Sequence, residues 1–287
     1  MNAPTPKAGR VEEITSPSNP RIKSIKALAM KKNREREGVF LAEGQKLVTD
    51  ALQQGWTIRT LLHSRRDARE HGKGDQIADL AAKVRALGGD ILVTNDKLLT
   101  SITRKDNPQT VVAVIEQAVS PLTSVVARQD ECWVALDRVR DPGNLGTIVR
   151  TVDALGVKGV VLVGDSTDPF ALEAVRATMG SLFHVALVKA TEAEFIDFTN
   201  QWRADGGIVT GTHLKGAVDH RSIDYSTKPQ LIVMGNEQQG MTNELINACD
   251  NVVLISMSGA ADSLNLAVAT GIILFEARRH SLAEIGA

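Results

Sequence analysis

The stretch that decides the fold is Asp137-Arg-Val-Arg-Asp-Pro-Gly-Asn-Leu-Gly-Thr-Ile-Val-Arg150, which directly follows the apolar run Trp133–Leu136. The run predicts a buried strand, and the stretch after it predicts a helix capped by Asn144. Gly146 and Arg150 are four residues apart and share a helix face, where the glycine would let a partner approach the backbone closely. We expect this face to turn away from the apolar stripe, which consists of Leu145, Ile148, Val149, Val152 and Leu155. A polar loop between a buried strand and a helix is where parallel sheets bind ligands.

A second loop of this kind is Met234-Gly-Asn-Glu-Gln-Gln-Gly240, at the end of a predicted strand at Gln230–Met234 whose run Leu231–Met234 is apolar. Gly235 and Gly240 bracket a tight turn that exposes backbone N–H and C=O groups and presents Glu237. Taken alone, the loop is better explained as an ordinary connection between a strand and a helix.

A third loop, Ile255-Ser-Met-Ser-Gly-Ala-Ala-Asp-Ser-Leu-Asn-Leu-Ala-Val-Ala269, follows a predicted strand at Val252–Ile255. We expect Ser263 to cap the final helix and Asn265 to lie in its first turn, where its amide could recognise polar groups. The helix is apolar on nearly all sides, so it is buried either in its own domain or against a second subunit.

In this order, the three loops resemble the signature motifs of the SpoU (TrmH-type) RNA 2′-O-ribose methyltransferases, members of the SPOUT superfamily. The matching patterns are Asp-Pro-x-Asn-x-Gly-x-x-x-Arg, Gly-Asn-Glu-x-x-Gly and Met-x-Gly-x-x-x-Ser-Leu-Asn, and Asp168-Pro-Phe170 with Arg176–Gly180 is similar to the family as well. The resemblance covers roughly residues 132–280. The first part of the chain resembles the L30e-like RNA-binding domain of many members, through Glu43-Gly and Pro108-Gln109.

The resemblance implies an α/β catalytic domain with a parallel sheet and a trefoil knot, which periodicity alone could not predict because knots are almost absent from proteins. It also implies a homodimer whose active site lies near the subunit contact, and S-adenosyl-L-methionine as the methyl donor. The resemblance implies catalytic roles for the residues at matching positions, which are Arg150, Asn144, Glu237, Ser263 and Asn265. Those that it places around the cofactor are Gly235, Asn236, Gly240, Ile255, Met257, Gly259 and Leu264.

Arg150 matches the catalytic arginine of the family, for which a role as general base is one assignment. A guanidinium with a pKa above about 12 rarely loses its proton. Our hypothesis is that Arg150 clamps the adjoining phosphate and stabilises the developing alkoxide, while the other polar residues orient the reactants. The third loop departs from the family pattern at Ser256, where proline is common, and at Ala267, where a small polar residue is common. Loop rigidity and cofactor affinity could differ for this reason.

Strand and helix patterns alternate along both halves of the chain, which predicts two α/β domains. We predict a disordered tail (1–13), an L30e-like RNA substrate-binding domain (14–116), a linker (117–131) and the methyltransferase domain (132–287). In the first domain the predicted strands are Val39–Leu41, Ile58–Leu62, Asp90–Val93 and Val111–Ile115, with helices from Pro20 and at Gln45–Leu52, Gln76–Leu87 and Lys97–Ile102. In the second, further strands are predicted at Gly159–Val163, His184–Leu187 and Gly207–Gly211.

The net charge of −1 says nothing about binding partners, but the distribution of the charged residues along the chain is informative. Residues 21–36 hold seven Lys or Arg against Glu35 alone, and such a cluster attracts a phosphate backbone. The alternative is a solvated helix face. The residues predicted to bind RNA are Arg21, Lys23, Lys31, Lys32, Arg34 and Arg176.

Composition excludes several other classes. The two cysteines, Cys132 and Cys249, cannot form a disulfide framework or a four-ligand zinc site, and they fit a reducing cytoplasm. No apolar run approaches the length of a bilayer span, so we expect no membrane segment, and we expect no metal. The glycine-rich turn of a Rossmann methyltransferase or dehydrogenase and the nucleophile elbow of a hydrolase are both missing. The prediction is ribose methylation, with ribosomal RNA preferred; the alternatives are transfer RNA as substrate, or a non-catalytic RNA-binding ribosome-assembly factor.

Overall fold

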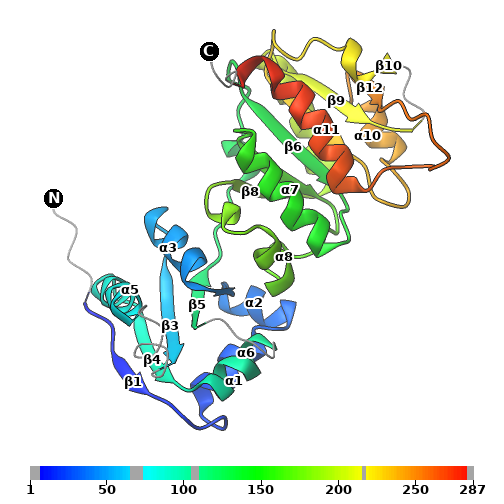
Figure 1. Cartoon of the computed structure of the whole chain (residues 1–287). Coiled ribbons are helices and arrows are strands. Elements are labelled where there is room, and N and C mark those ends of the chain that lie inside the picture. Colours follow the sequence, from blue (N-terminus) through cyan, green and yellow to red (C-terminus); the bar gives the residue numbers. More distant parts are fainter. Residues whose placement is uncertain (1–6, 65–73, 105–109, 215–217, 283–287) are drawn as a thin grey trace, which may run out of the picture. The chain divides into compact units, whose positions relative to one another are not determined.

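The structure is a computed structural model that describes residues 7–64, 74–104, 110–214 and 218–282 (Figure 1). The chain divides into two compact units, Met1–Ala118 with Phe170–Phe183, and Val119–Pro169 with His184–Ala287. The prediction of two α/β domains is confirmed. Residues 170–183 form an excursion of the chain from the second unit into the first. The prediction differs here, because it placed these residues in the catalytic domain.

The first unit is built on a mixed five-stranded sheet in the order β1-β4-β3-β5-β2. Its strands are β1 (Val11–Glu13), β2 (Val39–Glu43), β3 (Ile58–Ser64), β4 (Asp90–Thr94) and β5 (Val111–Glu116). Its helices are α1 (Pro20–Ala27), α2 (Lys31–Glu37), α3 (Gln45–Gln53), α5 (Gly74–Ala86), α6 (Asp96–Thr103) and α8 (Leu172–Ala177). The prediction of a disordered tail over residues 1–13 is wrong at its end, because β1 pairs in parallel with β4.

The excursion is held in the first unit by aromatic and charged contacts. Phe170 lies 4.9 Å from Phe40, centroid to centroid, and Phe183 lies 5.3 Å from Trp56. The guanidinium of Arg176 binds the buried carboxylate of Glu43, with Nη2 2.6 Å from Oε1. These residues come from distant parts of the sequence, so no local pattern could have predicted the contact.

The second unit contains a seven-stranded sheet in the order β10-β12-β9-β11-β6-β7-β8, in which every pair is parallel. The strands are β6 (Cys132–Asp137), β7 (Gly159–Val163), β8 (Ala186–Ala190), β9 (Ile208–Thr212), β10 (Val218–Asp219), β11 (Gln230–Met234) and β12 (Asn251–Leu254). The runs β7 and β11 are buried at every position, as a covered parallel sheet requires. The parallel sheet predicted for this domain is confirmed.

Helices cover both faces of this sheet. On one face, α9 (Glu192–Ala204) and α10 (Asn243–Asn247) contribute Phe195, Trp202 and Leu245 to the apolar core. On the other face, α7 (Pro142–Ala154) and α11 (Leu266–Arg278) lie side by side (Figure 1). Because all strands are parallel, the loops after β6, β9, β11 and β12 emerge at one edge of the sheet. No helix in the described part of the chain is long and apolar enough to cross a membrane.

Candidate active site

The first loop begins with a strained, charge-paired turn. Asp137 ends β6 with its side chain fully buried, and its carboxylate accepts from Nε and Nη2 of Arg138, both at 2.8 Å. Arg138 adopts a φ of 47°, in the left-handed region that side chains rarely occupy. The hydrogen bond to Asp137 raises the pKa of Arg138. Such strain persists only where the surroundings hold it, and it is common at functional sites.

The cap of α7 differs from the prediction. Asp141, not Asn144, is the N-cap, with its Oδ1 accepting from the backbone N of Asn144 at 2.6 Å and Pro142 beginning the helix. Asn144 therefore lies in the first turn, and its side chain is free to face the other loops. Gly146 is buried, so it does not share an outward face with the exposed Arg150.

Polar residues of all three loops meet in one hydrogen-bonded chain. Asn265 Nδ2 donates to Asn144 Oδ1 at 2.9 Å, and Asn144 Nδ2 donates to Glu237 Oε1 at 3.3 Å. The other carboxylate oxygen of Glu237 accepts from the backbone N of Arg140 at 3.4 Å. Three predicted site residues that lie up to 121 positions apart in sequence are thus brought together.

The second loop is closed by its own backbone. Asn236 and Gly240 exchange backbone hydrogen bonds of 3.1 and 3.0 Å, and Gly240 has a φ of 68°. The amide Nδ2 of Asn236 donates to the backbone O of Arg138 at 2.7 Å, which joins this loop to the first. A Cβ on Gly235 would lie 2.5 Å from the backbone N of Met241, so only glycine fits there.

The third loop reaches α11 through Asn265, which is the N-cap of that helix. Its Oδ1 accepts from the backbone N of Ala267 at 2.9 Å and of Val268 at 3.3 Å. The expectation that Ser263 caps the helix is therefore wrong. Because Asn265 uses its oxygen for the cap, its Nδ2 points to Asn144, and one side chain both starts the helix and joins the polar chain.

Two cavities open at this edge of the sheet. The larger, of about 580 Å³, is bounded by the ends of β9, β11 and β12 and by the loops that follow them. Six of the seven residues predicted to contact the cofactor line it, namely Gly235, Asn236, Gly240, Ile255, Met257 and Leu264; Gly259 does not. The smaller, of about 410 Å³, is lined by Arg140, Asp141, Asn144, Asn265 and five residues shared with the larger one. Two adjoining cavities can hold two reactants side by side.

The larger cavity fits a nucleoside with an amino-acid tail. Its volume lies in the range of small-molecule sites, and its lining combines apolar side chains, among them Met234, Ile255 and Leu264, with polar ones. Sequence reasoning missed Thr212, His213 and Leu214, which also line it. Thr212 ends β9, and the other two follow it; β9 lies between β11 and β12, and only that strand order reveals their place.

Comparison with known proteins identifies the family to which the chain belongs. Residues 131–275 match the SpoU rRNA Methylase family, and residues 19–113 match the MRM3-like substrate binding domain. The chain belongs to the SpoU rRNA methylase family. The predicted family is therefore confirmed, and the protein is an RNA methyltransferase.

Relatives resemble the chain over nearly its whole length. It is 36% identical to a 23S rRNA (uridine(2479)-2′-O)-methyltransferase of Streptomyces viridochromogenes, over 97% of this chain and 94% of the relative. It is 31% identical to a 23S rRNA (guanosine(2553)-2′-O)-methyltransferase of Bacillus subtilis, over 93% and 100%. A solved structure of an rRNA methyltransferase from Sinorhizobium meliloti, bound to S-adenosylmethionine, is 51% identical, with a TM-score of 0.89 over 96% of this chain and 100% of that one.

Arg150 lies apart from the polar chain within one copy of this SpoU-family protein. It is exposed on α7, it lines neither cavity, and its side chain makes no hydrogen bond or ion pair within the described residues. Arg150 lies six positions after Asn144, which places it about 9 Å further along the helix and about 120° around it. A catalytic role for Arg150 therefore needs something beyond this arrangement.

The residues predicted to bind RNA fall into two groups in the first unit. Lys23, Lys31 and Lys32 are exposed. The other three are held by the protein: Arg34 is buried and donates to the backbone O of Leu28 at 2.7 Å, Arg21 pairs with Glu12 and Asp90, and Arg176 pairs with Glu43. We therefore withdraw Arg34 and Arg176 from the RNA-binding set, because their guanidinium groups stabilise the first unit. Pro108 and Gln109 lie outside the described residues.

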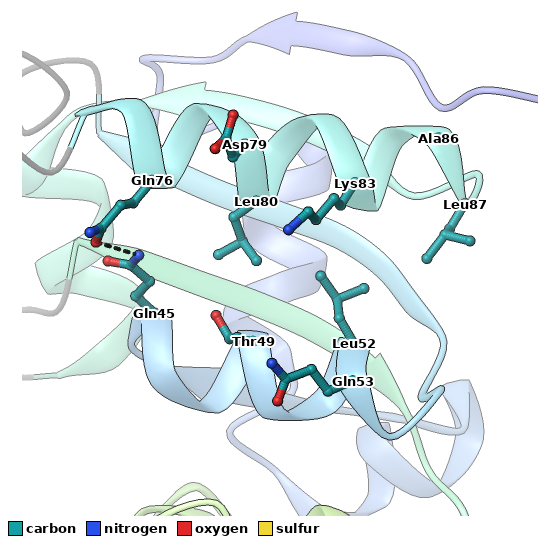
Figure 2. A pocket seen from close by; sticks show the side chains of 10 residues that line it. All are labelled: Gln45, Thr49, Leu52, Gln53, Gln76, Asp79, Leu80, Lys83, Ala86 and Leu87. Atoms are coloured by element: carbon teal, nitrogen blue, oxygen red, sulfur yellow. Dashed lines mark hydrogen bonds between the residues drawn. The ribbon is translucent and has the colours of Figure 1, made fainter.

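The first unit has a groove of its own between α3 and α5, of about 590 Å³ (Figure 2). Figure 2 shows Leu52 and Leu80 pointing into it, and Gln45 Nε2 donates to Gln76 Oε1 at 3.0 Å across one end. None of the predicted site residues lines it, and the three motif loops all belong to the other unit.

Proposed function

We propose that this protein transfers the methyl group of S-adenosyl-L-methionine to a ribose 2′-hydroxyl of ribosomal RNA. The observation that carries the proposal is the meeting of Asn144, Glu237 and Asn265 at the boundary of two adjoining cavities. Family membership and the names of the relatives, which modify 23S rRNA, support ribosomal RNA as the substrate class.

In this proposal the larger cavity holds the cofactor, which supplies an electrophilic methyl group when bound. Backbone groups around Gly235, Ile255, Met257 and Leu264 contact it, and Asn236 keeps the second loop closed. The smaller cavity receives the target nucleotide. Asn144 and Asn265 orient the ribose from its wall, and Glu237 fixes Asn144. The fixed geometry favours in-line approach of the ribose oxygen to the methyl carbon.

Arg150 completes the site across a dimer contact in our proposal. The exposed side chains of Val268, Ile272 and Phe275 recur at helical spacing and form an apolar stripe on α11. This helix packs beside α7, which exposes Arg150. A two-fold contact through the stripe would cover it and bring each Arg150 toward the other subunit. The homodimer is thus part of the proposed active site.

Replacing Phe275 by aspartate is expected to convert the dimer to monomer and to abolish methyl transfer. The side chain is 55% exposed in one protomer, so the charge does not disturb the fold of that protomer, but it cannot be buried unpaired in a dimer contact. Light scattering measures the mass. Leu87→Asp, at a residue of the first unit that is 64% exposed, is the matched control and should remain dimeric. A dimeric, active Phe275→Asp variant would place the contact elsewhere.

The exposed lysines of the first unit are expected to bind the RNA backbone. A Lys31→Ala/Lys32→Ala double variant should weaken RNA binding uniformly across sequences and reduce the slope of log K against log salt by about 2. Fluorescence anisotropy at several salt concentrations measures both quantities. Lys189→Ala/Lys228→Ala removes the same charge from the other unit. An equal change in the salt slope for both double variants would mean that RNA binding depends on the net charge of the protein and not on the position of these lysines.

The proposed activity is tested with tritiated-methyl S-adenosylmethionine and unmodified 23S, 16S and transfer RNA in separate reactions. We expect label in ribosomal RNA that survives alkaline hydrolysis as a dinucleotide, since 2′-O-methylation blocks cleavage. Label in transfer RNA alone would mean that transfer RNA, and not ribosomal RNA, is the substrate. RNA binding with no label in any RNA or in precursor ribosomes would favour a non-catalytic RNA-binding factor. The cytoplasmic location and the trefoil knot stay predictions.

A further inference from the structure

Residues 256–264 form an irregular, exposed segment between the end of β12 and the N-cap of α11. Met257, Asp262, Ser263 and Leu264 of this segment line the larger cavity, and so does Ile255, which precedes it. These lining residues form one wall of the proposed cofactor site, whereas Ser258 of the same segment does not line the cavity. A wall without regular structure must be held by something else if it is to keep its shape.

One hydrogen bond ties this segment to the rest of the protein. The hydroxyl of Ser256 donates to Oδ2 of Asp219 at 2.6 Å, across 37 positions of sequence. Within the described residues, it is the single hydrogen bond made by residues 256–264. The residues on either side of Ser256 both line the cavity, so fixing Ser256 also fixes Ile255 and Met257.

Asp219 is itself firmly anchored. It ends β10, where it is the register partner of Leu254 in β12. Its carboxylate accepts from Nε and Nη2 of Arg221, both at 2.8 Å, and from the backbone N of Arg221 at 2.9 Å. The hydrogen bonds from Arg221, followed by that from Ser256, hold the pKa of Asp219 well below its usual range. The acceptor for Ser256 is therefore a permanent carboxylate.

The neighbouring residue strengthens the anchor. His220 is buried, and its Nδ1 donates to the backbone O of Leu254 at 3.3 Å. The hydroxyl of Tyr225, also buried, donates to the backbone O of His220 at 3.0 Å. The first of these bonds joins residues 219–225 to the end of β12, directly before the cavity wall begins, and the second holds His220 in place within that segment.

We propose that Asp219 is a positioning residue, which fixes the third loop for cofactor binding through the hydroxyl of Ser256. The inference rests on the proposed function, because it assigns the wall to S-adenosylmethionine. Without the hydrogen bond the wall would sample more conformations, and binding would have to order it. A proline at position 256 would restrict the loop in another way, through the fixed φ of its ring.

The test compares cofactor binding by variants of the full-length protein. Ser256→Ala and Asp219→Ala are expected to weaken binding of S-adenosylmethionine and S-adenosylhomocysteine about five- to tenfold by calorimetry, the effect of losing one ordinary hydrogen bond, because Ser256 is exposed and water weakens the attraction of the carboxylate. Ser256→Thr keeps a hydroxyl and should bind like the unaltered protein. Ser258→Ala is the matched control, because Ser258 lies on the same loop and makes no hydrogen bond within the described chain.

Rescue and kinetics separate positioning from general damage. In the Asp219→Ala background, Ser256→Pro should restore most of the affinity, since the backbone N–H of Ser256 makes no hydrogen bond in the described structure that proline would remove. In methyl-transfer assays the KM for the cofactor should rise in Ser256→Ala while kcat at saturation is unchanged. Unaltered affinity in Ser256→Ala and Asp219→Ala would overturn the inference, and failure of the unaltered protein to bind either ligand would overturn the proposed function instead.

Discussion

Replacing Arg150 by alanine is expected to lower kcat at least about 100-fold, the scale of losing one preorganised group that stabilises developing charge. In the proposed mechanism the guanidinium binds the phosphate beside the target ribose and stabilises the alkoxide. Arg150 is exposed and has no partner in the described chain, so the fold and the melting temperature should not change. Single-turnover transfer at saturating cofactor measures the effect, and near-normal transfer would remove Arg150 from the mechanism.

A lysine at position 150 distinguishes a clamp from a general base. The ammonium group keeps the charge but cannot contact a phosphate with two parallel N–H groups, so the clamp predicts a large loss of kcat. A general base must lose its proton, and lysine does so at a pKa about two units or more below that of arginine. If residue 150 is a general base, Arg150→Lys should therefore transfer methyl groups at least as fast as the original protein, particularly at alkaline pH. An Arg150→Lys rate that matches or exceeds the original would contradict the clamp.

Mixing two inactive variants tests whether Arg150 acts across the dimer. If Arg150 serves the other subunit, a heterodimer of Arg150→Ala and Glu237→Ala contains one intact site. Random exchange should then restore about a quarter of the original activity. If both residues serve the same subunit, every site in the mixture lacks one of them. No recovered activity, with heterodimers shown by native mass spectrometry, would place Arg150 in its own subunit's site.

The buried strands were the part of the fold most open to prediction. The strands β7 and β11 are buried at every position, and their predicted bounds agree with the structure. Where burial is one-sided or pairing is distant, sequence failed. β1 is exposed at all three positions and exists because β4 offers it a partner, and residues 170–183 join the first unit through Phe40, Trp56 and Glu43.

At the site, it was easier to predict which residues belong to it than which contacts each of them makes. Asn144 and Ser263 are good capping residues, but Asp141 precedes a proline and Asn265 has an amide oxygen in the right place, so these two cap the helices. Such a competition is decided by backbone geometry, which spacing alone does not contain. The same holds for Arg34, whose charge suggests RNA but whose position after α1 lets it bind the carbonyl groups that end that helix.

Replacing Gly235 by alanine is expected to reduce affinity for S-adenosylmethionine at least about tenfold, which corresponds to about 1.4 kcal/mol. The added Cβ would lie 2.5 Å from the backbone N of Met241 and 2.6 Å from the backbone C of Gly240. Both neighbours are backbone atoms, so no side chain can move aside, and the loop has to open. Opening breaks the paired hydrogen bonds between Asn236 and Gly240 that close the turn lining the larger cavity.

The loss should be local, because the Gly235 loop ends β11 without contributing to the apolar core. Calorimetry with S-adenosylmethionine measures the affinity, and circular dichroism checks that the sheet is intact. Gly271→Ala is the matched control: a Cβ there meets only Cγ2 of Thr151, at an ordinary 3.9 Å, within helix α11. Alanine favours a helix interior over glycine, so this variant should melt no lower than the original and keep its cofactor affinity. Equal affinities for the two alanine variants would mean that the tight turn at Gly235 does not shape the cofactor site.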